Sequence, residues 1–204
     1  MVISDAGKEK SPVDSPGLLV DSTTVPLSAD QIDWLKSTIR DIPDFPRTGI
    51  VFKDLTTLLR DGVAFGFVVS VMAKRCARMN PDYIAGIEAR GFILGPAIAD
   101  RLGVGFVPIR KPGKLPHTTE KVDYQLEYGT DSLEVHVDAV EPGRKVVVVD
   151  DLLATGGTAR AAYELITRLG AEVVSLGFMV ELAFLSGRSK QPDGVDVFSL
   201  VVYD

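Results

Sequence analysis

The sequence predicts an α/β fold in which a mostly parallel sheet is flanked by helices. Short apolar segments alternate with helical patterns over most of the chain, and this alternation is typical of βαβ units. The run VVVV at residues 146–149 has no polar alternation, which indicates a strand that is covered on both faces. Two turns, EARG and the small-residue turn ATGGT, follow two of the apolar segments and lead into the next helical pattern.

Length, composition and charge restrict the class of protein. The 204 residues are enough for one domain with a well-buried core. With 46% hydrophobic and 25% charged residues, the composition is that of an ordinary globular protein. The net charge of −6 argues against general nucleic-acid binding, because few cations are left to neutralise phosphates. No apolar run reaches the about 18 residues that a membrane span needs, so we expect a cytoplasmic protein without membrane contact.

The N-terminal segment differs in composition from the rest of the chain. Residues 1–27 are rich in Ser, Asp, Pro, Gly and Thr without sustained periodicity, so we predict a disordered tail. Residues 28–204 form a single predicted domain. It begins with a helix, because Ser28 and Gln31 make an S-x-x-Q capping box, and we expect Pro43 and Pro46 to end that helix.

The later elements follow from periodicity and from turn residues. The expected helices cover residues 63–79, 91–102 and about 158–170. The expected strands cover residues 83–87, 105–110, 132–137, 146–149 and 173–182. Cys76, the only cysteine, lies in the first of these helices and is interpreted as a packing residue rather than a nucleophile.

A long polar connection interrupts this alternation at Lys111 to Ser132. A connection of this length inside a compact domain is usually a lid or a binding loop. His117 lies in it, and His136 falls on the polar side of the strand that follows. Neither histidine has a partner at a metal-ligand spacing, so we interpret both as surface residues.

Two adjacent carboxylates and a small-residue turn give the sequence its clearest chemical signal. Asp150 and Asp151 end the valine strand, and in open α/β sheets ligands bind at that end. The turn from Ala154 to Thr158 exposes backbone N–H groups at the start of a helix, which suits a phosphate. The carboxylates would repel a phosphate, so they must face sugar hydroxyls or a divalent metal. Together these groups fit a ribose 5-phosphate.

Other interpretations of the same stretch explain less. A helix entry with polar caps needs one acid or hydroxyl, and it accounts for neither the second aspartate nor the paired glycines. The chain has no G-x-x-x-x-G-K-[ST] motif and no G-x-G-x-x-G after a strand. Neither a P-loop NTPase nor a dinucleotide-binding fold is therefore supported.

An apolar strand, two acids and A-T-G-G-T resemble the phosphoribosyl pyrophosphate (PRPP) signature of the type I phosphoribosyltransferases. Four further stretches strengthen the resemblance to the members that act on adenine, and it covers about residues 30–204. They are IPDFPRTGIVFKDLT, GIEARGFILGPAIA, IRKPGKLP and YQLEYG. The resemblance implies a type I phosphoribosyltransferase-like parallel sheet with a small N-terminal hood, about residues 28–60, and a flexible loop.

The resemblance also implies a reaction. Members of this family that act on adenine transfer the 5-phosphoribosyl group from PRPP to N9 of adenine, giving AMP and pyrophosphate in purine salvage. They use Mg²⁺, which is held mainly through substrate and water with no direct protein ligand. They form homodimers, and in relatives some charges of the basic loop reach the neighbouring subunit's site.

The resemblance assigns the following roles by position. Glu127 and Arg90 are catalytic, and Tyr128 helps to close the loop. The ribose 5-phosphate of PRPP or AMP is bound by Asp150, Asp151, Ala154, Thr155, Gly156, Gly157 and Thr158. Pyrophosphate is bound by Ala89, Arg90, Arg110, Lys111 and Lys114, and adenine by Val51, Phe52 and Lys53. Glu88 stands where relatives often carry Asp, and His117 receives no role.

Two alternatives remain open at this point. Some relatives on this fold bind PRPP or purines to control transcription without catalysis, but the intact loop with Glu127 and the lack of a basic extension oppose that function. The other alternative is a transferase for a different base, such as hypoxanthine or a pyrimidine.

Overall fold

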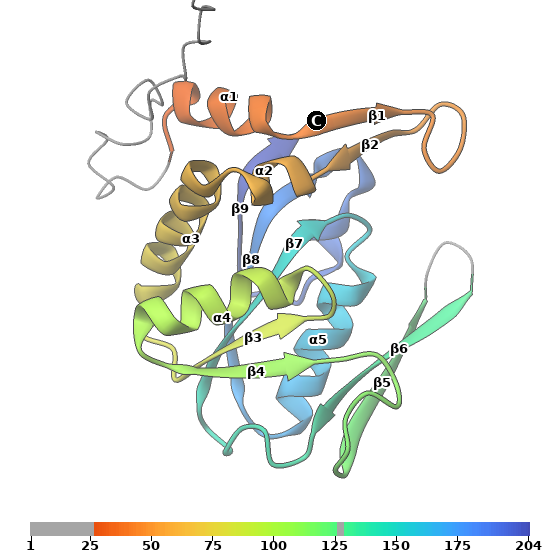
Figure 1. The fold of residues 1–204 in the computed structure, drawn as a ribbon. Helices are drawn as coiled ribbons and strands as arrows, with labels where there is room; N and C mark the ends of the chain where they lie inside the picture. Colours follow the sequence, from red (N-terminus) through yellow and green to blue (C-terminus); the bar gives the residue numbers. More distant parts are fainter. Residues whose placement is uncertain (1–26, 126–128) are drawn as a thin grey trace, which may run out of the picture. The chain divides into compact units, whose positions relative to one another are not determined.

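The computed structural model describes residues 27–125 and 129–204. The chain divides into two compact units, Met1–Phe67 and Val68–Asp204, and each is described here by itself (Figure 1). The predicted N-terminal tail, apart from Leu27, lies outside the described residues.

The first unit begins with the predicted capping box. The Ser28 hydroxyl accepts from the backbone N of Gln31 at 3.3 Å, and the Ser28 N–H donates to the Gln31 side chain at 2.9 Å. Helix α1 runs over Ala29–Thr38. The prediction that Pro43 and Pro46 end this helix was wrong, because a strand already begins at Arg40.

A short hairpin and a one-turn helix complete the described part of this unit. Strands β1 (Arg40–Pro43) and β2 (Val51–Asp54) pair antiparallel, and helix α2 covers Thr56–Arg60. Ion pairs join the two strands, with Lys53 donating to Asp41 at 2.7 Å. The pattern of residues 40–54 contains no sustained apolar alternation, so the sequence did not predict this hairpin.

A parallel sheet of five strands forms the centre of the second unit, which confirms the predicted parallel sheet, although its strand β9 (Asp196–Tyr203) was not predicted. The strand order is β4-β3-β7-β8-β9, and every neighbouring pair is parallel (Figure 1). The strands are β3 (Tyr83–Ile87), β4 (Gly105–Ile109), β7 (Lys145–Leu153), β8 (Glu172–Leu182) and β9 (Asp196–Tyr203). The helices are α3 (Gly62–Ala77), which begins in the first unit, α4 (Gly91–Leu102) and α5 (Gly157–Arg168).

The valine run of β7 is covered on both faces, as its lack of alternation predicted. Val146 and Val148 belong to the core cluster that includes Leu165 of α5. Val147 and Val149 point to the other face, because side chains alternate along a strand, and they are equally buried. Helix α4 packs against β3 and β7, while α5 packs against β7 and β8. Cys76 of α3 is fully buried, which agrees with a packing role.

An antiparallel hairpin replaces most of the long loop that the sequence predicted. Strand β5 (Thr119–Gln125) pairs with β6 (Thr130–His136), so the prediction of an irregular connection from Lys111 to Ser132 was wrong over β5. The hairpin packs on α5 through residues such as Leu133 and Val135. Val122 and Tyr124 alternate with polar residues in β5, but the glycines and the proline around it favoured a loop in the prediction.

The packing of α5 gives a direct prediction of stability. Leu165 is fully buried between the sheet and the hairpin, so Leu165→Ala should lower the free energy of unfolding by about 2 to 5 kcal/mol. Val137→Ala, at a site that is 43% exposed, serves as the control and should cost much less. Urea denaturation followed by circular dichroism measures both. Equal losses in the two variants would contradict this description of the core.

Candidate functional site

The order of the strands fixes where a ligand can bind in the second unit. From β3 the chain moves outward to β4 on one side, and it returns to place β7 on the other side. The direction of winding therefore reverses between β3 and β7, and open α/β sheets bind ligands outside the carboxyl ends of the strands at such a point. Residues 88–90 follow β3, and Asp150 lies in the last part of β7, so both reach this crevice.

A cavity of about 340 Å³ lies at this crevice. Residues that follow β3 and β4, together with residues of β7, β8 and the start of α5, enclose it. Its lining residues are Glu88, Ala89, Arg90, Lys111, Asp150, Asp151, Leu152, Leu153, Ala154, Thr155, Gly156, Thr158, Ala159 and Phe178.

The two aspartates lie side by side in this cavity with different surroundings. Asp151 is 5% exposed and accepts a hydrogen bond from the Arg90 Nε, while its own N–H donates to Asp150 Oδ1 at 2.9 Å. Burial, and then the neighbouring charge of Asp151, raise the pKa of Asp150 well above its ordinary value. The pair is therefore costly to keep fully ionised in the ligand-free protein.

The start of α4 can approach this pair only because residue 91 is glycine. A Cβ at Gly91 would lie 3.0 Å from Asp150 Oδ1 and 3.0 Å from the carbonyl oxygen of Val149. Contacts this short would require the Asp150 side chain and the β7 backbone to shift by a few tenths of an ångström. Gly91 therefore keeps Arg90, the residue before it, next to the aspartates.

The turn after β7 presents amide groups to the same cavity. Gly156 has φ +83° and stands at the N-cap of α5, and the first N–H groups of a helix have no intrahelical acceptor. The hydroxyl-bearing residues Thr155 and Thr158 also line the cavity. Free amides, hydroxyls and the positive end of a helix together favour an anion such as phosphate.

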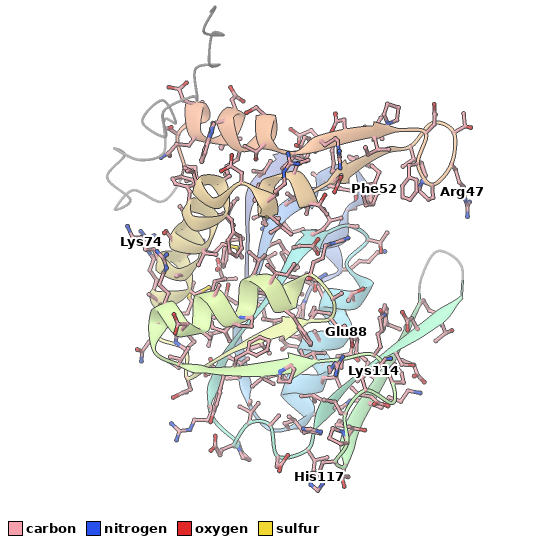
Figure 2. All side chains as sticks on the ribbon, viewed as in Figure 1. Arg47, Phe52, Lys74, Glu88, Lys114 and His117 are labelled. Atoms are coloured by element: carbon pink, nitrogen blue, oxygen red, sulfur yellow. The ribbon has the colours of Figure 1, made fainter. Side chains whose placement is uncertain are left out.

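Glu88 organises the basic residues that follow β4. Its carboxylate accepts from the backbone N of Lys111 at 3.0 Å and from two nitrogens of Arg110, each at 3.2 Å. The Lys111 amide, and then Arg110, lower the pKa of Glu88, so it is ionised at neutral pH. Figure 2 shows Glu88 and Lys114 close together, with His117 at the far end of the hairpin. Glu88 thus orients two of the cations that the sequence assigned to pyrophosphate.

Lys111 lines the cavity, and residues of the β5–β6 hairpin hold its ammonium group. Its Nζ donates to the Tyr124 hydroxyl at 2.9 Å and to the Asp131 carboxylate. Burial lowers the pKa of Lys111, but the hydrogen bonds to Asp131 and Tyr124 outweigh it and leave the pKa raised. The ammonium group therefore stays charged at the wall of the cavity.

The structure brings most of the predicted site residues of the second unit to one cavity. Ala89, Arg90, Lys111 and the residues from Asp150 to Thr158 line it, with the exception of Gly157. Arg110 and Lys114 do not line it, but Arg110 binds Glu88 and donates to the Lys114 carbonyl at 3.1 Å. The adenine residues 51–53 belong to the first unit, and Glu127 and Tyr128 lie outside the described residues.

Sequence reasoning missed some of the cavity wall. Leu152, Leu153, Ala159 and Phe178 line the cavity without having been predicted. Phe178 is opposite Asp150 in the register of β7 and β8. Only that register reveals its position, because within the sequence it is one more apolar residue of a buried strand.

The raised pKa of Asp150 predicts a pH-dependent gain of stability in Asp150→Asn. The folded carboxyl binds its proton more tightly than the unfolded one, whose pKa is about 3.9. The contribution of Asp150 to the stability of the protein should therefore fall as the pH rises from about 4 through the raised pKa, and the asparagine variant lacks this loss. Chemical denaturation of the ligand-free protein at about pH 4 and about pH 7.5 should show a gain that grows with pH.

Asp193→Asn, at an exposed site, controls for the loss of one negative charge. A gain of the same size at both pH values, or a loss that deepens with pH, would contradict the assigned environment of Asp150.

Comparison with known proteins identifies the family of this chain. Residues 59–193 match the family described as phosphoribosyl transferase domain. An adenine phosphoribosyltransferase of Acidobacterium capsulatum is 56% identical over 169 residues, which are 83% of this chain and 93% of that protein. Many further curated proteins also match.

Solved structures give the same relationship. The crystal structure of adenine phosphoribosyltransferase from Thermoanaerobacter pseudethanolicus has a TM-score of 0.80 and 53% identity, and it covers 84% of this chain and 99% of that chain. The Saccharomyces cerevisiae enzyme, complexed with an imino-altritol bisphosphate and adenine, has a TM-score of 0.78 and 40% identity over 85% of this chain and all of that chain (100%). The resemblance seen in the motifs is thus confirmed, and the chain belongs to the phosphoribosyltransferase family.

Proposed function

We propose that this protein transfers the 5-phosphoribosyl group from PRPP to N9 of adenine, giving AMP and pyrophosphate in purine salvage. One observation carries the proposal: two carboxylates, a phosphate-type helix start and two cations, Arg90 and Lys111, face a single cavity. Two relatives that are each 56% identical to this chain are named adenine phosphoribosyltransferases, which supports adenine as the acceptor.

The ribose 5-phosphate part of PRPP occupies the β7 side of the cavity. Its phosphate accepts from the amides at the start of α5 and from the hydroxyls of Thr155 and Thr158. Its diol donates to Asp150 and Asp151. Sugar hydroxyls stabilise the ionised carboxylates, so binding lowers the raised pKa of Asp150.

The pyrophosphate part meets the cations on the β3 side. Negative charge develops on the leaving pyrophosphate as its bond to C1′ breaks, so preorganised cations and N–H donors stabilise the transition state. Arg90 and Lys111 supply this charge beside Ala89, and Glu88 fixes the backbone that carries Arg110 and Lys111. Before the substrate arrives, Arg90 is paired with Asp151 and Lys111 with Asp131. Pyrophosphate therefore replaces Asp151 and Asp131 as the partner of these two cations.

The acidic groups of the cavity fit magnesium that enters with PRPP. The described residues contain no cluster of three or more His, Cys, Asp or Glu that could hold a metal ion. Mg²⁺ keeps several waters and is commonly bound by one or two carboxylates together with substrate phosphates. Here Asp150 and Asp151 face the ribose diol, so Mg²⁺ would be held mainly through PRPP and water, with no direct protein ligand. When bound, Mg²⁺ neutralises charge on the pyrophosphate oxygens.

Adenine binds at strand β2 of the first unit. The ring stacks on Phe52, which is labelled in Figure 2. Phe52 packs edge-on against Phe45 with ring centroids 5.3 Å apart. Backbone groups of Val51 and Lys53 read the edge of the base, and residues two apart in a strand direct their backbone groups to the same side. The amine of adenine donates to a carbonyl there. The oxo group of hypoxanthine would face that carbonyl with both groups unsatisfied.

Glu127 completes the chemistry from the loop between β5 and β6. Adenine attacks C1′ through N9 when its proton is on N7. The ring becomes cationic as the bond forms, and the carboxylate of Glu127 accepts the N7 proton. Tyr128 closes the loop over the reacting atoms.

The protein works as a homodimer in the cytoplasm, with residues 28–204 as one domain and residues 28–60 as its hood. Arg110 and Lys111 belong to the basic loop that completes the neighbouring site. Within the part of the chain that the structure describes, no helix is both long and apolar enough to cross a membrane.

Substrate choice tests the adenine assignment. Pyrophosphate release, measured with each nucleobase in turn, should show a kcat/KM for adenine that exceeds that for hypoxanthine by about 10⁴. Comparable values for the two bases would refute the backbone reading at Val51 and Lys53 while leaving the transferase class intact. Saturable PRPP binding without turnover of any base would favour a regulatory protein.

Glu127→Gln tests the proposed proton acceptor. Glutamine keeps the shape but accepts no proton, so kcat should fall by about 10² to 10⁴ while the affinity for PRPP stays within about threefold. Glu172→Gln is the matched control and should keep full activity. Glu172 is exposed at the amino end of β8, and the cavity lies at the carboxyl ends of the strands. A chemical step in single-turnover kinetics that matches the wild type would remove Glu127 from the mechanism.

A further inference from the structure

The turn Ala154–Thr158, which follows β7, lies against the backbone of the segment between β8 and β9. Two short 3-10 turns, η2 (Ala183–Leu185) and η3 (Gly187–Lys190), connect β8 to β9. A Cβ built on Gly187 would lie 2.1 Å from the Ala154 carbonyl oxygen and 2.9 Å from the Gly156 nitrogen. The two backbones therefore touch directly, with no space for a side chain between them.

Gln191 binds both sides of this contact. Its Nε2 donates to the Gly156 carbonyl at 3.1 Å and to the Gly187 carbonyl at 2.9 Å, and the residue is 8% exposed. This orientation of the amide follows from chemistry, because the flipped amide would point its oxygen at two carbonyls. Gln191 thus joins the turn to the segment behind it.

Gln191 lowers the stability of the fold relative to an apolar side chain in this space. Among the described residues its Oε1 is buried with no hydrogen-bond partner, and an unsatisfied buried oxygen costs stability. An apolar side chain of similar volume would avoid that cost. What an apolar side chain could not do is hold the two carbonyl groups.

Arg188 fixes the segment itself to the sheet. Its Nε donates to Glu181 Oε1 at 3.0 Å, and its Nη1 donates to the Val197 carbonyl. The hydrogen bond from Arg188 is the largest of the effects that lower the pKa of Glu181, which therefore remains ionised and paired. Gln191 consequently holds the turn from a rigid base rather than from a free loop.

We propose that Gln191 is a positioning residue for the anion at the start of α5. The Gly156 carbonyl and the Gly157 N–H belong to one planar trans peptide and point in opposite directions. Holding this carbonyl from behind, together with the first helical hydrogen bond from Arg160 N at 3.0 Å, aims the Gly157 N–H out of the amino end of the helix. The inference rests on the proposed binding of the 5-phosphate at Ala154–Thr158.

The test compares two buried glutamines. Gln191→Met keeps the length of the side chain but removes its donor. Gln31→Met is the matched control, because Gln31 is 6% exposed and its side chain caps α1 in the first unit. For each variant, calorimetry gives the Kd of ribose 5-phosphate, steady-state assays give the KM of PRPP and the kcat, and thermal unfolding gives the Tm.

For Gln191→Met, both the Kd of ribose 5-phosphate and the KM of PRPP should rise about tenfold. Its kcat at saturating PRPP and its KM for adenine should stay within about twofold. The control should lose Tm without any change in the Kd. Gln191→Leu takes the place of the methionine variant if the latter does not fold.

Two results would overturn this inference alone. An unchanged Kd in Gln191→Met, whatever its Tm, would leave Gln191 with a purely structural role, and so would a lower kcat with unchanged KM. The proposed phosphate site fails in a different way, if wild-type protein itself binds no ribose 5-phosphate saturably.

Discussion

The burial of strand β7 on both faces is the constraint on which the rest of the site depends. Val146 and Val148 pack towards α5, and Val147 and Val149 pack towards the opposite layer. A strand buried in this way can carry polar side chains only near its ends. Because β7 lies next to β3 at the point where the winding reverses, its carboxyl end opens into the ligand crevice. The packing of the core therefore sets the position of the carboxylates.

The position of the two aspartates at the end of β7 makes their ionisation unfavourable in the ligand-free protein. Asp151 is buried beside the half-buried Asp150, so burial and the charge of Asp151 both oppose the ionisation of Asp150. Arg90 relieves part of this by pairing with Asp151. A ligand with hydroxyl donors at one end and anionic groups at the other can donate to the two carboxylates and bind Arg90 directly. The charged groups are thus already arranged for the ligand before it binds.

The sequence predicted the elements whose signals are local. The bounds of β3 and α4 match the prediction, because the buried run of β3 and the glycine turns mark their ends. Strand β5 was missed because only Val122 and Tyr124 alternate with polar residues in it, and the glycines and proline around it favoured a loop; the pairing with β6 identifies it. The contributions of Phe178 and Gln191 depend on which strands and turns are neighbours in space, and no local pattern records that.

The most direct test of the central claim is a crystal structure of the protein with AMP. The account predicts that the phosphate accepts hydrogen bonds from the amides at the start of α5 and that the ribose hydroxyls donate to Asp150 and Asp151. A phosphate bound elsewhere, for example beside Arg160 and Lys190, with the carboxyl end of β7 unoccupied, would contradict it.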